Sequence, residues 1–253
     1  MQASQAHPSK FFAANKPDDD SSSKQRLLIG FIGLAFPFVL WLLNAWRLQS
    51  SQRWSTLPSV SAYYYTGAVS AFAGVLVALA IFLFSYKGYR NSYRLLDLIA
   101  AKIACFAALG VALFPTGAAE GQPALPWWTA PVGVVHFTSA TILFLSFSFI
   151  SIFLFTRSAK GGGSRSAGKT VRKVLYIACG IGMLACLGWA GIAEIRKSPI
   201  FWPEALALEF FAVSWLVKGR ADTTVAAVAK AGAGRIRHPF GGPSGKITAS
   251  RAA

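Results

Sequence analysis

Six long apolar runs dominate this sequence and constrain its fold more than any other feature. They cover residues 27–46, 62–86, 95–114, 131–156, 174–194 and 201–217. A helix needs about 20 mainly apolar residues to cross the hydrocarbon core of a bilayer. The first five runs reach this length, whereas the sixth is shorter and contains Glu204 and Glu209. The sequence predicts an all-α fold, namely a polytopic six-helix transmembrane bundle with disordered basic termini.

Polar segments on either side of these runs predict three regions. Residues 1–26 are polar and are expected to form a disordered cytoplasmic arm. Residues 27–218 would form the six-helix transmembrane domain. Residues 219–253 are rich in Ala and Gly and carry basic side chains, so we expect a disordered basic cytoplasmic tail.

The composition argues against a water-soluble enzyme. Hydrophobic residues make up 54% of the chain and charged residues 13%, compared with about 25% charged residues in soluble domains. The net charge is +16, from 25 basic and 9 acidic residues. Because the charges stand between apolar runs, we expect anionic lipid headgroups as partners on the cytoplasmic side and no nucleic acid.

The positions of the basic residues predict the orientation in the membrane. Most lie in the N-terminal arm, in the loops after the second and fourth runs, and in the C-terminal tail. Lys and Arg remain preferentially on the cytoplasmic side. Both termini are therefore predicted to be cytoplasmic, in the inner (plasma) membrane of a cell. This requires an even number of spans and so supports the sixth run.

Ionisable residues within the runs are candidates for function because a charge inside a membrane needs a partner or a role. At 1.5 Å per residue, Lys102 lies about 10 Å and Glu209 about 12 Å into their spans. We hypothesise that they form an intramembrane charge pair, as a structural lock or as part of a polar pathway. Lys102 reaching back to the surface is the alternative. Asp97, three residues after Arg94, is interpreted as a helix-start carboxylate with a local cation.

A second group of polar residues lies near the predicted outer surface. His136, Glu204 and Asn44 approach this level, as do Tyr63 and Tyr64, and they define a candidate outer polar pocket. The alternatives are a histidine hydrogen-bonded within its helix, a carboxylate favoured at a helix N-terminus after Pro203, and tyrosines that anchor the headgroup boundary.

Motifs for catalysis or cofactor binding are not recognised. Two of the three histidines, His7 and His238, lie in the polar arms, so a haem or zinc ligand set is not expected. We predict no cofactor, no metal site and no catalytic residue. Small residues in the second and fifth runs favour close helix packing and a homo-oligomer. They are Gly67, Ala71, Gly74, Ala78, Gly180, Gly188 and Gly191.

Three short segments together resemble a known type of membrane protein. They are Ser59-Val60-Ser61-Ala62-Tyr63-Tyr64-Tyr65-Thr66-Gly67, Phe114-Pro115-Thr116-Gly117 and Val135-His136-Phe137, with further likeness at 83–89 and 214–219. Over about residues 27–219 the chain resembles a family of uncharacterised six-span bacterial inner-membrane proteins, loosely similar to the DRAM/Frag/Sfk type. The resemblance implies a six-span architecture, and the family has no established catalytic residues that could be assigned to positions of this chain.

Three functional interpretations remain open at this point. The first is a non-enzymatic multi-pass integral membrane protein with a structural, sensory or lipid-interacting role. The second is a small transporter or proton-linked channel subunit that uses Glu209, Lys102 and His136. The third is a membrane-embedded lipid-modifying enzyme that uses the outer polar pocket. A continuous water path would favour the second, and convergence of His136 and Glu204 beside an opening to lipid would favour the third.

Overall fold

Helices account for the regular structure of this protein in a computed structural model that describes residues 19–47, 54–88, 92–157 and 167–219. No strand occurs in these ranges, so the predicted all-α class is confirmed for them. The elements are α1 (Asp19–Arg47), the 3-10 helix η2 (Ser61–Tyr65), α2 (Val69–Ser85), α3 (Arg94–Leu113), α4 (Ala130–Phe149), the π-helix η3 (Ile150–Leu154), α5 (Ala167–Ile195) and α6 (Phe201–Lys218).

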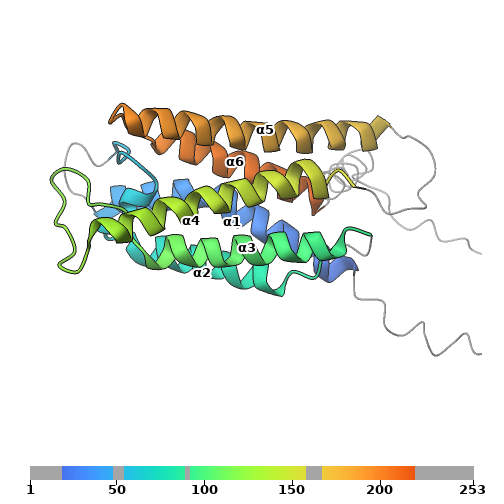
Figure 1. Cartoon of the computed structure of the whole chain (residues 1–253), viewed down its shortest axis with the longest axis horizontal. Coiled ribbons are helices and arrows are strands. Elements are labelled where there is room, and N and C mark those ends of the chain that lie inside the picture. The colour runs from blue at the N-terminus through green and yellow to red at the C-terminus, as the bar shows by residue number, and fades with distance from the viewer. Residues whose placement is uncertain (1–18, 48–53, 89–91, 158–166, 220–253) are drawn as a thin grey trace, which may run out of the picture.

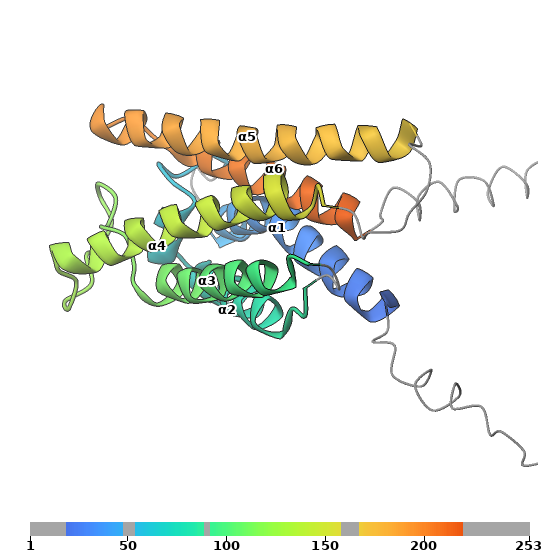
Figure 2. The ribbon, with the colours of Figure 1, turned by 45° about the vertical axis from the view of Figure 1, so that its right-hand side comes forward.

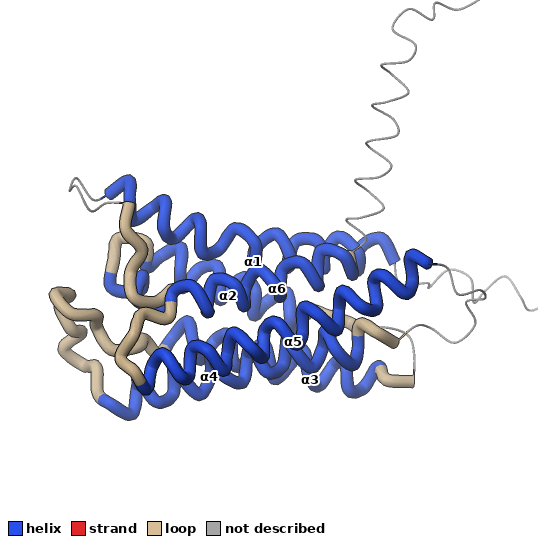
Figure 3. Tube along the Cα trace, turned by 90° about the horizontal axis from the view of Figure 1, so that it is seen from above, coloured by secondary structure: helices blue, strands red, loops and turns tan. Residues whose placement is uncertain are grey.

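The six α-helices lie lengthwise side by side and alternate in direction (Figure 1). The described connections gather at the two ends of the bundle (Figure 3). Each helix packs on its neighbours in the sequence, and α6 closes the bundle against α1 (Figure 2). We call the end that carries η2 the η2 end, and the end where α1 begins the Asp19 end.

The core is filled by aromatic and small side chains. Phe147 of α4 stacks on Phe211 of α6 with ring centroids 4.0 Å apart, so these helices also meet across the bundle. Glycines bring α1 and α6 together: Cβ atoms added at Gly30 and Gly33 would lie within 3 Å of Leu216 and Phe211. Such close approach of backbones is typical of helices that pack within membranes.

Within the described residues, four helical segments are long and apolar enough to cross a membrane. They are Ser23–Arg47, Arg94–Leu113, Ala130–Leu154 and Thr170–Ile195. Helix α2 is apolar but has 17 residues, and α6 has 18 residues that include Glu204, Glu209 and Lys218. Length and composition therefore support four spans, and the predicted number of six is not confirmed by them.

The first helix begins earlier than predicted. Helix α1 starts at Asp19, so residues 19–26 of the predicted disordered arm are helical. Tertiary hydrogen bonds support this extension, because Ser23 Oγ donates to the Gly219 carbonyl (3.3 Å) and Gln25 Nε2 to the Phe82 carbonyl (2.7 Å). The rest of the predicted arm and residues 220–253 of the tail lie outside the described residues.

The second apolar run is interrupted near its start. Helix η2 ends at Tyr65 and α2 begins only at Val69. Thr66 forms the break: its hydroxyl donates to the Tyr63 carbonyl (2.8 Å) and accepts from the Ala68 N–H (3.1 Å). Threonine often makes such local bonds in place of helical ones. The break keeps η2 at the bundle end, where it contributes to the candidate site.

Candidate functional site

His136 is almost completely buried at the η2 end, with 1% of its surface exposed. Its Nδ1 lies 2.6 Å from the Phe114 carbonyl oxygen. Because a carbonyl can only accept, Nδ1 carries the proton of the neutral ring. Nε2 is then the acceptor and receives the hydroxyl of Ser61 at 3.0 Å. These two bonds connect α4 to the end of α3 and to η2.

Glu204, near the start of α6, binds the segment that precedes η2. Its Oε2 accepts from the Val60 N–H at 2.6 Å. In the opposite direction, the Pro58 carbonyl accepts from the N–H groups of Ile200 (2.6 Å) and Phe201 (2.9 Å). The first N–H groups of a helix have no partner within the helix. The start of α6 and residues 58–60 therefore satisfy each other's backbone groups.

Ser61 links the two predicted residues, although it was not among the sequence-based candidates. Its hydroxyl binds His136, and the residue before it, Val60, binds Glu204. The histidine lies 75 residues away in the sequence. No local pattern around Ser59-Val60-Ser61 indicates such a partner. We call Ser61, His136 and Glu204, together with the backbone groups they bind, the outer polar cluster.

Three consecutive carbonyls after α3 each accept a side-chain hydrogen bond. The Phe114 carbonyl receives His136, the Pro115 carbonyl receives Trp128 Nε1 at 3.1 Å, and the Thr116 carbonyl receives the Tyr65 hydroxyl. These carbonyls follow the last turn of α3, where backbone acceptors lack helical partners. The three sequence segments that carry the resemblance given above thus meet at one place in the fold.

The other predicted pocket residues take different positions. The Tyr63 ring is fully buried against Phe201, with centroids 6.2 Å apart. Burial raises the pKa of Tyr63, and the nearby Leu57 backbone lowers it in part. Tyr64 packs edge-on against Tyr65 and Phe72. Asn44 is buried on α1, but within the described ranges no hydrogen bond joins it to His136 or Glu204.

Ser61 and His136 of the outer polar cluster are buried, whereas Glu204 is partly exposed. Only 8% of the Ser61 surface is exposed, and the Val60 N–H is already bound to Glu204. The geometry can orient a serine hydroxyl toward a neutral histidine, and it fixes the η2 segment to α3, α4 and α6. Among the described residues, no three His, Cys, Asp or Glu side chains are placed to hold a metal ion.

The hypothesised pair of Lys102 and Glu209 is not formed. Lys102 Nζ donates to the Phe84 carbonyl and lies 3.4 Å from the centroid of the Phe84 ring. Glu209 Oε1 has no hydrogen-bond partner in the part of the chain that is described. The reason is the order of helices in the bundle: α3 packs on α2 and α4, whereas α6 packs on α1 and α5.

A second polar cluster, missed by sequence reasoning, lies at the Asp19 end. Asp97 is buried and accepts from the Tyr86 hydroxyl at 3.4 Å, whereas Arg94 is exposed and forms no ion pair with it. Arg26 is buried with its guanidinium 5.7 Å from the Tyr86 ring centroid. Lys218 donates to the Phe155 carbonyl at 2.7 Å. Asp97 therefore belongs to a tertiary cluster rather than to a local pair on α3.

No protein-family model, curated protein or solved structure matches the chain. The function is therefore inferred from the geometry of the chain's own residues. The two features that carry it are the apolar perimeter of the helices and the polar clusters at the two ends of the bundle.

Proposed function

We propose that this chain is a non-enzymatic, six-span integral membrane protein of the bacterial inner membrane with a lipid-interacting role. One observation carries the proposal: large apolar side chains are exposed on every α-helix. Examples, one from each helix in order, are Phe38, Ile81, Phe106, Leu145, Ile181 and Leu206. In water so extensive an apolar surface leads to association, whereas hydrocarbon solvates it.

The two shorter helices are part of this proposal. At 1.5 Å per residue, α2 and α6 are about 26 and 27 Å long, close to the ~30 Å hydrocarbon core. Both lie alongside the longer helices in the bundle (Figure 1). Glu204 and Lys218 stand near the two ends of α6. Glu209 is then the one ionisable residue of α6 that lies at the depth of the hydrocarbon core. A membrane-spanning helix can carry one carboxyl group at this depth if that group is neutral.

The orientation follows from charge. Described basic residues at the Asp19 end include Lys24, Lys87, Arg94, Arg157, Arg172 and Lys173, whereas the η2 end has Arg47, Arg196 and Lys197. The positive-inside rule then makes the Asp19 end cytoplasmic, together with both termini. Exposed tryptophans at the η2 end fit the opposite headgroup boundary. They are Trp46, Trp54, Trp127 and Trp202.

The partners in this proposal are membrane lipids and a second copy of the chain. Anionic headgroups complement the basic Asp19 end. Added Cβ atoms at Gly74, Gly188 and Gly191 would meet nothing within 4 Å, so these glycines leave room on the bundle surface. Small residues on such a surface permit close approach of another helix. This supports a homo-oligomer, whose test is cross-linking in native membranes.

The experiment for the proposed function combines fractionation with reporters fused at each end of the full chain. We expect the protein to stay in carbonate-washed membranes and to need detergent for extraction. A fluorescent protein that folds only in the cytoplasm should be bright at both ends, and alkaline phosphatase should be inactive at both. Reporters active on opposite faces, or a protein soluble without detergent, would overturn the proposal.

The lipid-modifying enzyme remains the second candidate, because Ser61 Oγ donates to His136 Nε2 as in an activated serine. Two observations argue against this enzyme. The Ser61 side chain is buried, and the Val60 N–H is already bound to Glu204 and is not free to bind a substrate. A fluorophosphonate probe tests it in the purified, detergent-solubilised protein. We expect no labelling of Ser61. Labelling that disappears in Ser61→Ala would establish a reactive serine and overturn the non-enzymatic assignment.

The transporter or channel subunit has less support. It needs Glu209, Lys102 and His136 to share a pathway. Lys102 is bound to the Phe84 carbonyl and His136 to Ser61 and Phe114. Within the described ranges, no hydrogen bond or ion pair joins any two of the three.

A further inference from the structure

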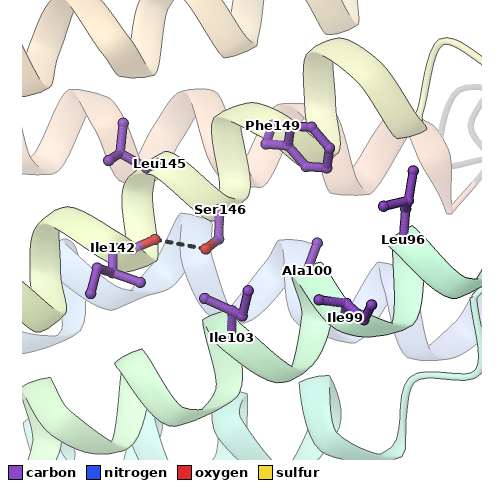
Figure 4. Close-up of a pocket in the computed structure, with 8 residues that line it drawn as sticks. All are labelled: Leu96, Ile99, Ala100, Ile103, Ile142, Leu145, Ser146 and Phe149. Carbon is purple, nitrogen blue, oxygen red and sulfur yellow. Dashed lines mark hydrogen bonds between the residues drawn. The ribbon is translucent and has the colours of Figure 1, made fainter.

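An apolar groove runs between α3 and α4 on the outside of the bundle (Figure 4). It has a volume of about 370 Å³ and is lined by Leu96, Ile99, Ala100 and Ile103 of α3 and by Ile142, Leu145, Ser146 and Phe149 of α4. The one polar side chain, Ser146, donates its hydroxyl to the Ile142 carbonyl at 2.7 Å. The groove therefore offers an occupant apolar contacts and no free side-chain hydrogen-bond donor.

Two arginines belong to the segments that adjoin one end of the groove. Leu96 and Phe149 mark its limit toward the Asp19 end (Figure 4). Arg94 stands two residues before Leu96 at the start of α3 and is exposed. Arg157 Nη1 donates to the hydroxyl of Tyr93, the residue before Arg94, at 3.1 Å, and the Arg157 guanidinium lies 4.7 Å from the Tyr93 ring centroid. Arg157 and Arg94 are therefore both next to Tyr93, three residues before the groove residue Leu96, and we call this end the mouth of the groove.

The backbone between Phe149 and Arg157 has an unusual conformation. Residues Ile150–Leu154 form the π-helix η3, and the Phe155 N–H reaches the Ile150 carbonyl at 2.8 Å. A short π-helix widens the helix that contains it and often occurs at functional sites. Here it lies between the groove and Arg157, on the path that brings this arginine to Tyr93.

We propose that the groove and its mouth bind one anionic phospholipid. An acyl chain would lie in the groove, and the phosphate would bind Arg157 and Arg94. Guanidinium groups suit this role because their N–H donors match the geometry of phosphate oxygens. From Leu96 to Ile103 the groove is about 10 Å long at 1.5 Å per residue, which is a segment of one acyl chain. The proposal rests on the proposed function, which puts this mouth at the cytoplasmic leaflet.

The charge of the mouth selects among lipids. Arg94 is exposed and Arg157 contacts Tyr93, the residue before Arg94, while the acidic side chain of α3, Asp97, is buried and bound to Tyr86. A headgroup with net negative charge gains from both arginines. A zwitterionic headgroup brings a cationic amine to the same place and loses part of this attraction. A free phosphate ion has the charge but gains nothing from the apolar groove.

Native mass spectrometry of the full chain in detergent tests the proposal with phosphatidylglycerol and phosphatidylcholine of the same acyl chains. The wild type should retain one phosphatidylglycerol in preference to phosphatidylcholine, and inorganic phosphate should not displace it. A surface-proximal arginine contributes about 1 kcal/mol to binding of anionic lipid, or about fivefold in affinity. The double variant Arg94→Gln with Arg157→Gln should therefore lose about 25-fold.

Two further variants separate the parts of the site. Ile103→Trp fills the groove from an exposed position and should weaken retention with the arginines intact. The matched control, Arg196→Gln, removes an exposed arginine at the η2 end and should bind as the wild type does. Thermal unfolding of each variant shows that the fold is kept. A phosphatidylglycerol with a photoreactive acyl chain should label residues 96–103 or 142–149.

Equal retention of the two lipids, or a double variant that binds as well as the wild type, would overturn the proposal. Displacement by inorganic phosphate would do the same, because the phosphate site would then not depend on the acyl groove. In each of these outcomes the protein still requires detergent and keeps its topology. The failure of the lipid site is thus distinguishable from failure of the proposed function.

Discussion

The hydroxyl of Ser61 donates to Nε2 of His136 across 3.0 Å, and both side chains are buried at the η2 end. The direction of this bond is set by the Phe114 carbonyl, which holds the proton on Nδ1. Together with Glu204 on the Val60 N–H, it fixes the segment between α1 and α2 to three other helices. The first two predictions test whether this cluster is structural.

Replacing His136 should destabilise the protein strongly. His136→Ala leaves the Phe114 carbonyl and the Ser61 hydroxyl without partners and opens a cavity, so we expect a loss of about 2–4 kcal/mol. Ser61→Ala removes one hydrogen bond and should cost about 1 kcal/mol. Unfolding in detergent, followed by tryptophan fluorescence, measures both. Thr138→Ala, at an exposed site on the same helix, is the control. An unchanged His136→Ala variant would contradict the structural role.

Replacing Glu204 should loosen the segment before η2. Glu204→Ala leaves the Val60 N–H unpaired, at a cost of about 1–3 kcal/mol. Glu204→Gln keeps one acceptor oxygen and should lose less. Hydrogen exchange of the amides of residues 59–62 is the direct readout. We expect it to be fastest in Glu204→Ala, slower in Glu204→Gln and slowest in the wild type. Identical exchange in all three proteins would show that the carboxylate does not hold this segment.

Glycines at helix contacts should be distinguishable from glycines on the perimeter. A Cβ added at Gly30 would lie 2.9 Å from the Leu216 backbone nitrogen. A Cβ added at Gly74 would have no atom of another helix within 4 Å. Gly30→Ala should therefore destabilise the protein by about 1–3 kcal/mol. Gly74→Ala should leave stability unchanged or raise it, because alanine favours helix. Thermal unfolding of the two variants compares them, and equal midpoints would argue against the α1–α6 contact.

The buried phenol of Tyr63 predicts sensitivity to alkaline pH. Burial raises its pKa above the usual value of 10.0, so the folded protein holds the proton more tightly than the unfolded chain. This contribution to stability is complete below pH 10 and is lost as pH rises through the higher pKa of the folded state. Tyr63→Phe should remove that part of the pH dependence. Parallel stability curves for the two proteins above pH 10 would contradict the assignment.

The helices were largely predictable from sequence because each apolar run is long, but their ends and contacts were not. The start of α1 at Asp19 depends on hydrogen bonds from Ser23 and Gln25 to other helices. The break at Thr66 depends on side-chain bonds within an apolar run. Neither the start of α1 nor the break at Thr66 changes the hydropathy pattern, so neither could be predicted from that pattern.

The candidate site was predictable in its residue types and not in its connections. His136 and Glu204 were recognisable because ionisable groups are rare in apolar runs. Ser61, which links them, is one of many serines, and its role depends on a partner 75 residues away. The pair of Lys102 with Glu209 was wrong because hydropathy gives depth in a membrane but not which helices are neighbours. Asp97 was paired with Arg94 because their spacing along one helix is visible in the sequence, whereas the contact of Asp97 with Tyr86 is not.

Labelling of single cysteines in intact cells tests the six-span claim most directly, because four and six spans place the loops on different faces. Glu120 lies between α3 and α4 and Ser92 before α3, and both are exposed. With six spans, a membrane-impermeant maleimide should label Glu120→Cys in intact cells and Ser92→Cys only after permeabilisation. The native cysteines Cys105, Cys179 and Cys186 are buried and are replaced by alanine beforehand. If α2 and α6 do not cross, the two labelling patterns should be exchanged, and that result would contradict the account.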